Sequence, residues 1–474
     1  MTLNIVTKTV REEPSDLLLI HAAELATCSN APRSDACSDS DGPWRGAAMG
    51  DIGIIRDGAI AVRSGVIVDV GTTQEVLSRE PLCEPSPGLP SCAAGAPGAP
   101  GASSASGAPH VIDASGCTVL PGFVDAHTHL VFAGERYREH VMRLGGAKYL
   151  DILAAGGGIL STLTSTRSAS LSELVAGAMK RLDVMLLHGT TTVEAKSGYG
   201  LDIDTEIRQL EAAKLASEAH PVDVVSTFMG AHAVPPEFAG DPEGYLGFVL
   251  SEALPAVEEQ GIAEFCDVFC EEGVFSVEQS RRVLRAGMEH GLRPKIHADE
   301  IFAMGGAQLA AELGAVSADH LAAASEEGIR SLARSGVVAV LLPATMFTLM
   351  SRAYADARAM IDAGVAVALA TDFNPGTSPT MSMPFVITLA CLKMKMTPPE
   401  AVCAATRNAA CAIGLGGRAG VIEVGRDADF VVCDVPAVDA LPFSVGVNPV
   451  RDVVKRGAHV VKSEGGGRLC HSRI

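Results

Sequence analysis

Aromatic residues are scarce in this chain of 474 residues: they make up 4% of it, with one Trp and five Tyr. A large core is still available, because 47% of the residues are hydrophobic and 20% are charged, which excludes a chain disordered throughout. Cationic residues are fewer than anionic ones, with 37 Lys and Arg against 56 Asp and Glu. The net charge of −19 argues against a nucleic-acid partner, since phosphate binding needs a concentrated basic surface. No apolar run approaches the roughly 18–20 residues that span a bilayer, so no membrane contact is expected.

The cysteines lack the pattern of a disulfide framework. All 12 are scattered along the chain, and several lie in apolar runs, where a free cysteine behaves as a small buried hydrophobe. Cys266 and Cys270 have no further Cys or His close by, which favours core residues over a zinc pair. Residues 1–16 contain charges but no apolar segment typical of a secretory signal. We therefore expect a reducing, cytoplasmic location.

Both ends of the chain contain short β-like runs. A stretch rich in Pro, Gly and Ala, 84–109, interrupts the first group and is predicted to be a disordered insertion, and 29–49 has a similar composition. Turn dipeptides, Asp57-Gly58 and Arg456-Gly457, separate some of the runs. We predict one composite β domain from residues 1–120 and 416–474. Its expected strands are Leu17–Ile20, Ile52–Ile55, Ala59–Val62, Val66–Val70, Thr118–Leu120, Asp429–Cys433, Val450–Lys455 and His459–Val461.

The middle of the chain, residues 121–415, alternates strand-like apolar runs with longer stretches of helix-favouring composition. Two such helical stretches are Thr205–Ala219 and Val277–His290. Strands that each precede a helix predict an α/β fold, a (β/α)8 TIM barrel, with its active site at the carboxyl ends of the strands. The eight expected strands are Gly122–Ala126, Thr191–Ala195, Val224–Met229, Phe265–Phe269, Pro294–Ile296, Ala315–Ala318, Val337–Leu342 and Val365–Ala370.

Polar residues follow several of these expected strands. His127 and His129 are two residues apart, so a strand would point both imidazoles to the same side, toward one metal ion. His297, His320 and Asp372 follow later strands at the same end of the barrel. Each alone has an ordinary structural explanation, such as a helix N-cap for Asp372. Their shared position predicts a metal site.

Longer strings around these residues resemble the metal-dependent amidohydrolase superfamily. The narrower resemblance is to the family of enzymes that open an imidazolone ring in histidine degradation, and it covers about Leu17 to Val461. The strings that carry it are Pro121–Asp125 followed by His127-Thr-His129, and then His129–Arg136, Glu194–Gly200, Gly230–Pro235, His297–Glu300 and Thr371–Gly376. The resemblance implies a hydrolase that acts on the cyclic amide of a small molecule, 4-imidazolone-5-propanoate.

The resemblance also implies roles for particular residues. The implied metal ligands are His127, His129, His297 and Asp372, holding one zinc or iron ion, because the fourth strand lacks the bridging lysine of binuclear relatives. The implied catalytic residues are Glu300 as proton shuttle, His320 beside the carbonyl, and Asp372. The implied substrate-binding residues are Arg136, Tyr199, His232, Glu300, Asn374, Gly376 and Thr377.

Two alternatives stay open at the level of sequence. A mononuclear amidohydrolase deaminase of a purine or pyrimidine base would share the ligands, Glu300 and His320, although it would have no reason to keep Arg136, Tyr199 and His232. A non-catalytic scaffold with this fold would be expected to have lost the ligands. Relatives often form dimers, so a homodimer is expected, although one chain reveals no interface.

Overall fold

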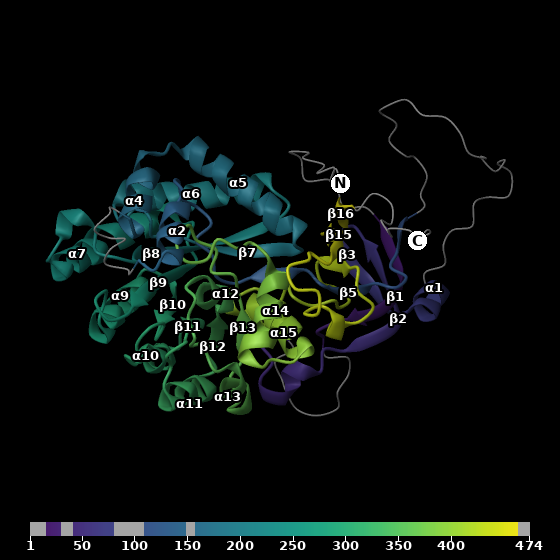
Figure 1. The fold of residues 1–474 in the computed structure, drawn as a ribbon. Coiled ribbons are helices and arrows are strands. Elements are labelled where there is room, and N and C mark those ends of the chain that lie inside the picture. The colour runs from purple at the N-terminus through teal and green to yellow at the C-terminus, as the bar shows by residue number, and fades with distance from the viewer. Residues whose placement is uncertain (1–15, 30–40, 80–108, 148–156, 463–474) are drawn as a thin grey trace.

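The computed structural model describes residues 16–29, 41–79, 109–147 and 157–462. A helix-wrapped barrel and a separate β-sheet lie side by side, and the sheet contains strands from both ends of the chain (Figure 1). The predicted disordered insertion, 84–109, lies outside the described residues except for its last position. In the described ranges, no helix combines the length and the apolar character needed to cross a bilayer.

The barrel contains eight parallel strands in sequence order, which confirms the predicted fold class. It closes where the segments after its first and last strands meet: the His129 amide donates to the Phe373 carbonyl at 2.8 Å, and the Asp372 amide to the His127 carbonyl at 3.0 Å. The closure therefore positions three of the predicted site residues. The strands are β6 (Phe123–Asp125), β7 (Thr190–Lys196), β8 (Asp223–Ala231), β9 (Phe265–Cys270), β10 (Arg293–Ala298), β11 (Ser317–His320), β12 (Val338–Leu341) and β13 (Val367–Leu369).

Helices surround the barrel, and several of them begin at a residue whose side chain caps the helix. Ser170 and Ser276 each form a reciprocal capping box at the start of a long helix. The predicted helical stretches Thr205–Ala219 and Val277–His290 form α6 and α9. The helices of this part are α2 (Tyr137–Leu144), α4 (Ile159–Ser168), α5 (Leu171–Leu187), α6 (Ile203–Ala219), α7 (Pro242–Phe248), α8 (Leu254–Gln260), α9 (Val277–Glu289), α10 (Gly306–Leu313), α11 (Glu326–Ser335), α12 (Pro343–Thr348), α13 (Ala357–Asp362), α14 (Met383–Met394), α15 (Pro398–Ala405) and α16 (Arg407–Ala412).

The second sheet has the order β16-β15-β14-β5-β1-β2-β3, with β4 also paired to β1. Its C-terminal strand β14 pairs antiparallel with β5, which directly precedes the first barrel strand. The two ends of the chain thus meet as predicted, while the domain boundaries after 120 and 415 stay a prediction. The strands are β1 (Leu17–Ala26), β2 (Ile54–Arg63), β3 (Val66–Thr72), β4 (His110–Asp113), β5 (Thr118–Pro121), β14 (Phe430–Cys433), β15 (Val450–Lys455) and β16 (Ala458–Val461), and helix α1 (Thr73–Arg79) follows β3.

The expected turn at Asp57-Gly58 is wrong, because both residues lie inside the continuous strand β2. Asp57 has φ +48°, and the facing strand β1 has an irregular register beside His21, whose φ is +62°. A contact of 3.0 Å between the His21 ring and the Asp57 carboxylate holds this bulge. The dipeptide therefore bends a strand instead of ending one. Strand β4 was not predicted, because it begins directly after the Pro- and Gly-rich stretch.

Part of the stretch 29–49 is packed, contrary to the expectation from its composition. The Trp44 amide donates to the Asn408 side chain at 2.8 Å, and the Asn408 amide group donates back to the Trp44 carbonyl at 2.9 Å. Met49, in a short 3-10 helix (Gly46–Gly50), is fully buried. A single anchored aromatic residue thus fixes a segment of otherwise polar composition against the barrel.

Asp223, at the start of β8, joins the barrel to the second sheet. Its carboxylate accepts from Lys455 Nζ at 2.9 Å and from Arg456 Nη2 at 2.6 Å, at the turn between β15 and β16. Burial raises the pKa of this carboxyl, but Lys455 and Arg456 outweigh that effect and hold the pKa below its ordinary value. Folding therefore favours the ionised form of Asp223.

We expect Asp223→Asn to destabilise the protein by about 2 kcal/mol at pH 7, because it removes hydrogen bonds to two cations. The folded-state pKa is depressed, so the contribution is complete above the unfolded pKa of about 3.9 and is lost as the pH falls through the folded value. Midpoints of urea unfolding should accordingly differ at pH 7 and differ less at a pH below about 4, where the loss of this contribution begins. An equal difference at both pH values would contradict this account.

Candidate active site

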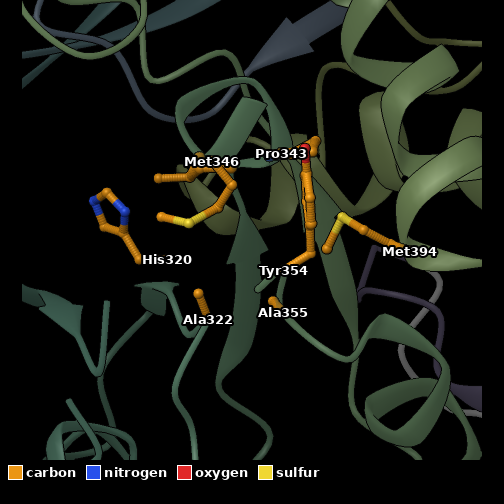
Figure 2. A pocket seen from close by; sticks show the side chains of 8 residues that line it. His320, Ala322, Pro343, Met346, Tyr354, Ala355 and Met394 are labelled. Atoms are coloured by element: carbon orange, nitrogen blue, oxygen red, sulfur yellow. The ribbon is translucent and has the colours of Figure 1, made fainter. Parts of the chain in front are cut away.

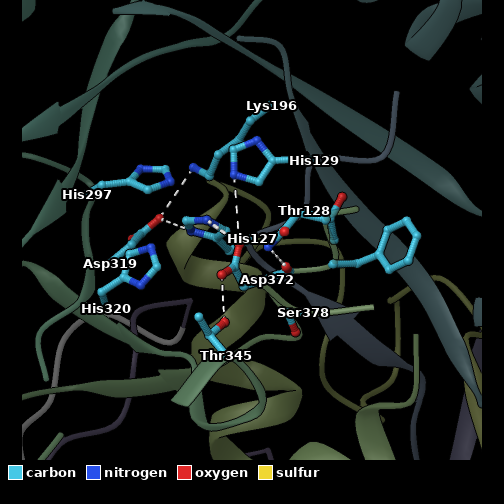
Figure 3. Close-up of polar contacts among 12 residues, drawn as sticks. His127, Thr128, His129, Lys196, His297, Asp319, His320, Thr345, Asp372 and Ser378 are labelled. Carbon is cyan, nitrogen blue, oxygen red and sulfur yellow. Dashed lines mark hydrogen bonds and ion pairs between the residues drawn. The ribbon is translucent and has the colours of Figure 1, made fainter. Parts of the chain in front are cut away.

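The structure gathers the predicted metal ligands at the carboxyl ends of the barrel strands (Figure 3). The ring centroids of His127 and His297 are 4.5 Å apart, and those of His127 and His129 are 5.6 Å apart. Two overlapping groups have donor atoms within 4.8 Å of one another: His127 with His129 and His297, and His127 with His320 and Asp372. All of these residues are buried.

Two aspartates orient two of the histidine rings. His127 Nδ1 lies 2.6 Å from the Asp319 carboxylate, and His297 Nδ1 lies 3.1 Å from the Asp267 carboxylate. Each aspartate favours the tautomer with the proton on Nδ1, which leaves Nε2 with its lone pair. Both Nε2 atoms are buried and have no hydrogen-bond partner. A divalent metal would satisfy them, so the donor set fits the metal that the sequence predicts.

Burial keeps the imidazoles in the neutral form that binds metals. It lowers the pKa of His127 well below the ordinary value, and Lys196 and the neighbouring histidines lower it further. Burial, followed by His232 and His297, does the same for His129. A cluster of neutral rings can supply several nitrogen ligands at neutral pH without releasing protons.

Asp372 completes this cluster from the segment after β13. Its Oδ1 lies 3.4 Å from His127 Nε2 and 3.8 Å from His129 Nε2, while its Oδ2 accepts from the Thr345 hydroxyl at 2.6 Å. Burial raises the pKa of Asp372 to about 6 despite that hydrogen bond. The residue also has φ +51°, a left-handed conformation that the barrel closure enforces.

Glu300 and His320 lie beside the proposed ligands, and the ring centroid of His320 is 5.0 Å from that of His297. Glu300 Oε2 is 3.7 Å from His320 Nδ1, which is buried and has no hydrogen-bond partner. Burial raises the pKa of Glu300 to about 8, with further contributions from the Asp372 and Glu271 carboxylates. A carboxyl group with such a pKa can both accept and release a proton near neutral pH.

His320 borders a small cavity of about 10 Å³ with mostly apolar walls (Figure 2). In Figure 2 its ring lies on the side of Met346, which belongs to α12, while Met394, at the end of α14, lies beyond Tyr354. Burial is accordingly the main reason that the pKa of His320 lies well below its ordinary value. The other lining residues are Ala322, Leu342, Pro343, Met346, Tyr354, Ala355 and Met394.

Arg136, the predicted anion-binding residue, forms a bidentate ion pair with Glu139 of α2. Its Nε donates to Glu139 at 2.9 Å and its Nη2 at 2.8 Å, and the buried Glu139 also accepts from the Gly158 amide. A guanidinium has five N–H donors, so three take no part in this pair. The pair fixes the side-chain direction, and the end with Nη1 and Nη2 stays able to bind a carboxylate.

The Asn374–Thr377 loop packs against this arginine. Asn374 Oδ1 accepts from the Gly376 and Thr377 amides at 2.9 and 2.7 Å, so its side chain shapes the loop. Sequence reasoning missed Arg143, whose Nη2 donates to the Gly376 carbonyl at 3.0 Å and whose buried Nη1 has no hydrogen-bond partner. Its spacing of seven residues from Arg136 on one helix would have been the signal.

Tyr199 and His232 form the wall beside His129. The His232 ring stacks on His129 at 4.9 Å, and Tyr199 lies 5.4 Å from His232. Burial, followed by the neighbouring His297 ring, lowers the pKa of His232 to about 3, so this ring is neutral. Glu206 accepts from the Gly198, Gly200 and Leu201 amides and thereby holds the loop that presents Tyr199.

Three further buried residues were not assigned from the sequence: Lys196, Asp267 and Asp319. Lys196 Nζ lies 2.7 Å from Asp267, 3.0 Å from Glu194 and 3.3 Å from Asp319. Charged residues inside otherwise apolar strands were the available signal, since burial of a charge requires a partner. Alternation along β7 also places Glu194 and Lys196 on the same side of the strand.

Comparison with known proteins assigns the chain to a family. The amidohydrolase family profile matches residues 118–460. The chain is 50% identical to the imidazolonepropionase of Geobacillus sp. (strain WCH70) over 96% of this chain and 99% of that protein. It is 49% identical to the imidazolonepropionase of Brevibacillus brevis, with 95% and 98% covered. The chain belongs to the imidazolonepropionase family of amidohydrolases. Its site is accordingly that of a metal-dependent hydrolase.

Solved amidohydrolases share the fold at much lower identity. An adenosine deaminase from Xanthomonas campestris, solved with bound zinc, superposes with a TM-score of 0.59 at 19% identity, covering 96% of this chain and 94% of that one. A triazine hydrolase from Arthrobacter aurescens superposes with a TM-score of 0.65 at 17% identity, covering 95% and 96%. These likenesses support the barrel with its added β-sheet as the architecture of an imidazolonepropionase-family member.

Proposed function

We propose that this chain hydrolyses the ring amide of 4-imidazolone-5-propanoate to N-formimidoyl-L-glutamate in histidine degradation. The observation that carries the proposal is the 50% identity with an imidazolonepropionase over nearly the full length of both chains. The geometry supports it, because a cluster of metal-binding donors, a carboxyl group of raised pKa and an anchored arginine lie around one end of the barrel. These groups provide, in the same order, metal binding, proton transfer and recognition of the propionate carboxylate.

The proposed metal ligands are His127, His129, His297 and Asp372, holding one zinc or iron ion. The buried, unpartnered Nε2 atoms of His127 and His297 support this assignment. When bound, such an ion supplies a Lewis acid and an acidified water molecule. The protein itself supplies ligand orientation, through Asp319 and Asp267, and a site enclosed by buried side chains.

Proton transfer is assigned to Glu300. In the proposed reaction, Glu300 accepts a proton from the attacking water and delivers it to the ring nitrogen as the carbon–nitrogen bond breaks. Its position beside His320, and its pKa of about 8, suit both steps. A neutral His320 can donate one hydrogen bond to the carbonyl oxygen as negative charge develops there. Asp372 assists the proton transfer.

Substrate recognition is assigned to the Arg136 corner and to the ring wall. The end of the guanidinium that Glu139 leaves open binds the propionate carboxylate, with Thr377 as a neighbouring polar contact and Arg143 adding positive charge. Gly376 and Asn374 bring the loop close to this carboxylate. Tyr199 and His232 enclose the imidazolone ring, in the orientation set by the stacking of His232 on His129.

Gly376→Ala tests whether the position of Arg136 controls substrate affinity. A Cβ at this residue would lie 2.3 Å from Arg136 Nη1 and 2.5 Å from its Cζ, so the flexible arginine must move. We expect KM for the propionate substrate to rise about tenfold, which corresponds to ~1.4 kcal/mol. The thermal midpoint should stay within about 2 °C of the parent, because only a side-chain end is displaced. A KM equal to that of the parent would separate Arg136 from binding.

Incubation of the purified protein with imidazolone propionate, guanine and cytosine tests the activity itself. We expect loss of imidazolone absorbance and no ammonia from either base. Ammonia release without loss of imidazolone absorbance would instead identify a deaminase. Metal content after gentle purification addresses the scaffold alternative, since a chain without zinc or iron would favour it.

Location and assembly complete the proposal. A cytoplasmic location is supported by the cysteines, which are all free thiols in the described ranges. A homodimer is supported by exposed apolar side chains in the loop before β15, namely Phe443, Val445 and Val447. Light scattering during size-exclusion chromatography should give twice the chain mass of 48.9 kDa. A monomer mass would remove this part of the proposal.

A further inference from the structure

Lys196 occupies an unusual position beside the proposed metal ligands (Figure 3). Its side chain, from β7, is fully buried, and its ammonium group lies among three buried carboxylates, those of Glu194, Asp267 and Asp319. Figure 3 shows the contact with Asp319. A lysine that is buried away from water needs carboxylate partners to balance its charge, so charge pairing by itself explains why the carboxylates are there. The identity of the three partners indicates a further role, in the metal site.

Two of the three carboxylates are those that orient the metal-binding rings. Asp267 Oδ2 accepts from Lys196 Nζ at 2.7 Å and lies 3.1 Å from His297 Nδ1. Asp319 Oδ2 lies 3.3 Å from Lys196 Nζ and 2.6 Å from His127 Nδ1. In each case one oxygen contacts both the ammonium and the imidazole. A single cation therefore connects the supports of two rings that come from strands β6 and β10.

Lys196 also contacts a further group of potential metal-binding side chains, where its ammonium takes the place that a metal ion could occupy. His127, Glu194 and Asp319 have donor atoms within 4.8 Å of one another, which is an arrangement that suits a cation. The Lys196 ammonium already contacts both carboxylates of this group. The protein's own cation thus satisfies these acids and leaves the Nε2 side of the rings for an external ion.

We propose that Lys196 is a positioning residue of the metal centre, which holds Asp267 and Asp319 in place and so fixes His127 and His297 for metal binding. The inference rests on the proposed function, because it takes both histidines as ligands. Supports behind metal ligands typically change metal affinity by about 10–100-fold when they are removed. Without the ammonium, the two carboxylates lose their common anchor and the rings lose a defined direction.

Lys295 provides the matched control. It is also a fully buried lysine in the barrel, and it pairs with Glu194 at 3.0 Å. Its other contacts are the Ala126 and Ala412 carbonyls at 3.4 and 3.1 Å, rather than the aspartates behind the histidines. Lys196→Met and Lys295→Met therefore remove the same charge from a similar environment, and only the first removes the shared support of the ligands.

The experiment measures zinc affinity of the full-length, metal-stripped variants by competition with a chelator, together with the visible spectrum of the cobalt-loaded forms. Both substitutions should lower the thermal midpoint of the metal-free protein. Zinc affinity should fall at least tenfold in Lys196→Met and stay within about threefold in Lys295→Met, and only the first should change the cobalt spectrum. Where Lys196→Met yields no folded protein, Lys196→Gln, which keeps one neutral donor beside Asp267, takes its place with the same expectation.

Equal zinc affinity and equal cobalt spectra in the Lys196 and Lys295 variants would overturn the positioning role. The proposed function would survive that result, because the parent would still bind zinc. If the parent itself binds neither zinc nor iron, the proposed function fails instead, and the role of Lys196 fails with it. The two failures are therefore distinguishable in one series of measurements.

Discussion

Glu300→Gln is expected to lower kcat by about 10²–10⁴-fold while the protein keeps its metal. The amide has nearly the same size as the carboxylate, so packing next to His320 is preserved, but it cannot take a proton from water and return it to the ring nitrogen. Glu300 is not among the proposed ligands, and its Oε2 lies 3.7 Å from His320 Nδ1. Steady-state kinetics and metal analysis on the same preparation measure both parts.

The control for this substitution is Glu272→Gln. Glu272 lies in the exposed segment after β9, on the same end of the barrel, so the variant removes an equal charge without touching the proposed proton path. Its kcat should equal that of the parent. A Glu300→Gln enzyme within a few-fold of the parent would assign the proton transfer to another group, and Asp372 would be the first to test.

Arg136→Met is expected to lower kcat/KM for the propionate substrate by about 10–100-fold, mainly through KM. A hydrogen-bonded contact between two charged groups is worth about 1.5–3 kcal/mol, and each 1.4 kcal/mol is a factor of ten. The carboxylate is remote from the bond that breaks, so its binding energy is realised in the ground state as well as in the transition state. KM should therefore change more than kcat.

A substrate analogue makes the test of Arg136 sharper. An imidazolone without the propionate arm should be a poor substrate for the parent and an equally poor one for Arg136→Met. Arg138→Met, from an exposed position of the same helix, should behave as the parent does. Because Arg136→Met leaves Glu139 without its ion-pair partner, Arg136→Met/Glu139→Gln checks for an indirect effect. An unchanged KM in both variants would exclude Arg136 from the pocket.

The barrel was predictable because its strands are short apolar runs with regular spacing. Each of the eight expected runs corresponds to one strand from β6 to β13, within a few residues. The second sheet was less predictable. Asp57 and Gly58 look like a turn in any local window, and only the pairing of β2 with β1 on both sides of them shows that they lie inside one strand, next to an irregularity in β1. The same local residue types occur in turns and in strand irregularities, so the local sequence does not distinguish the two.

The site was predictable only in part, for a similar reason. His127, His129, His297 and Asp372 follow recognisable strand ends, so their convergence follows from the barrel. Lys196, Asp267 and Asp319 lie in β7, β9 and β11, and nothing in any one strand states that one ammonium contacts two of those carboxylates. Arg136 was predicted to bind the carboxylate of the substrate, whereas its bidentate ion pair with Glu139 was found only in the structure.

Scarce aromatics, an acidic balance and the absence of long apolar runs bounded the kind of protein, and the periodic strands and strings of ligand residues determined the fold class and the family. Sequence by itself goes that far because periodicity and motif spacing are properties of the chain. Tertiary structure decided which buried charges pair, which ring nitrogens stay unpartnered and which edge of Arg136 is open. Those features depend on distances between strands that are far apart in the chain, where a difference of about 1 Å separates a hydrogen bond from no contact.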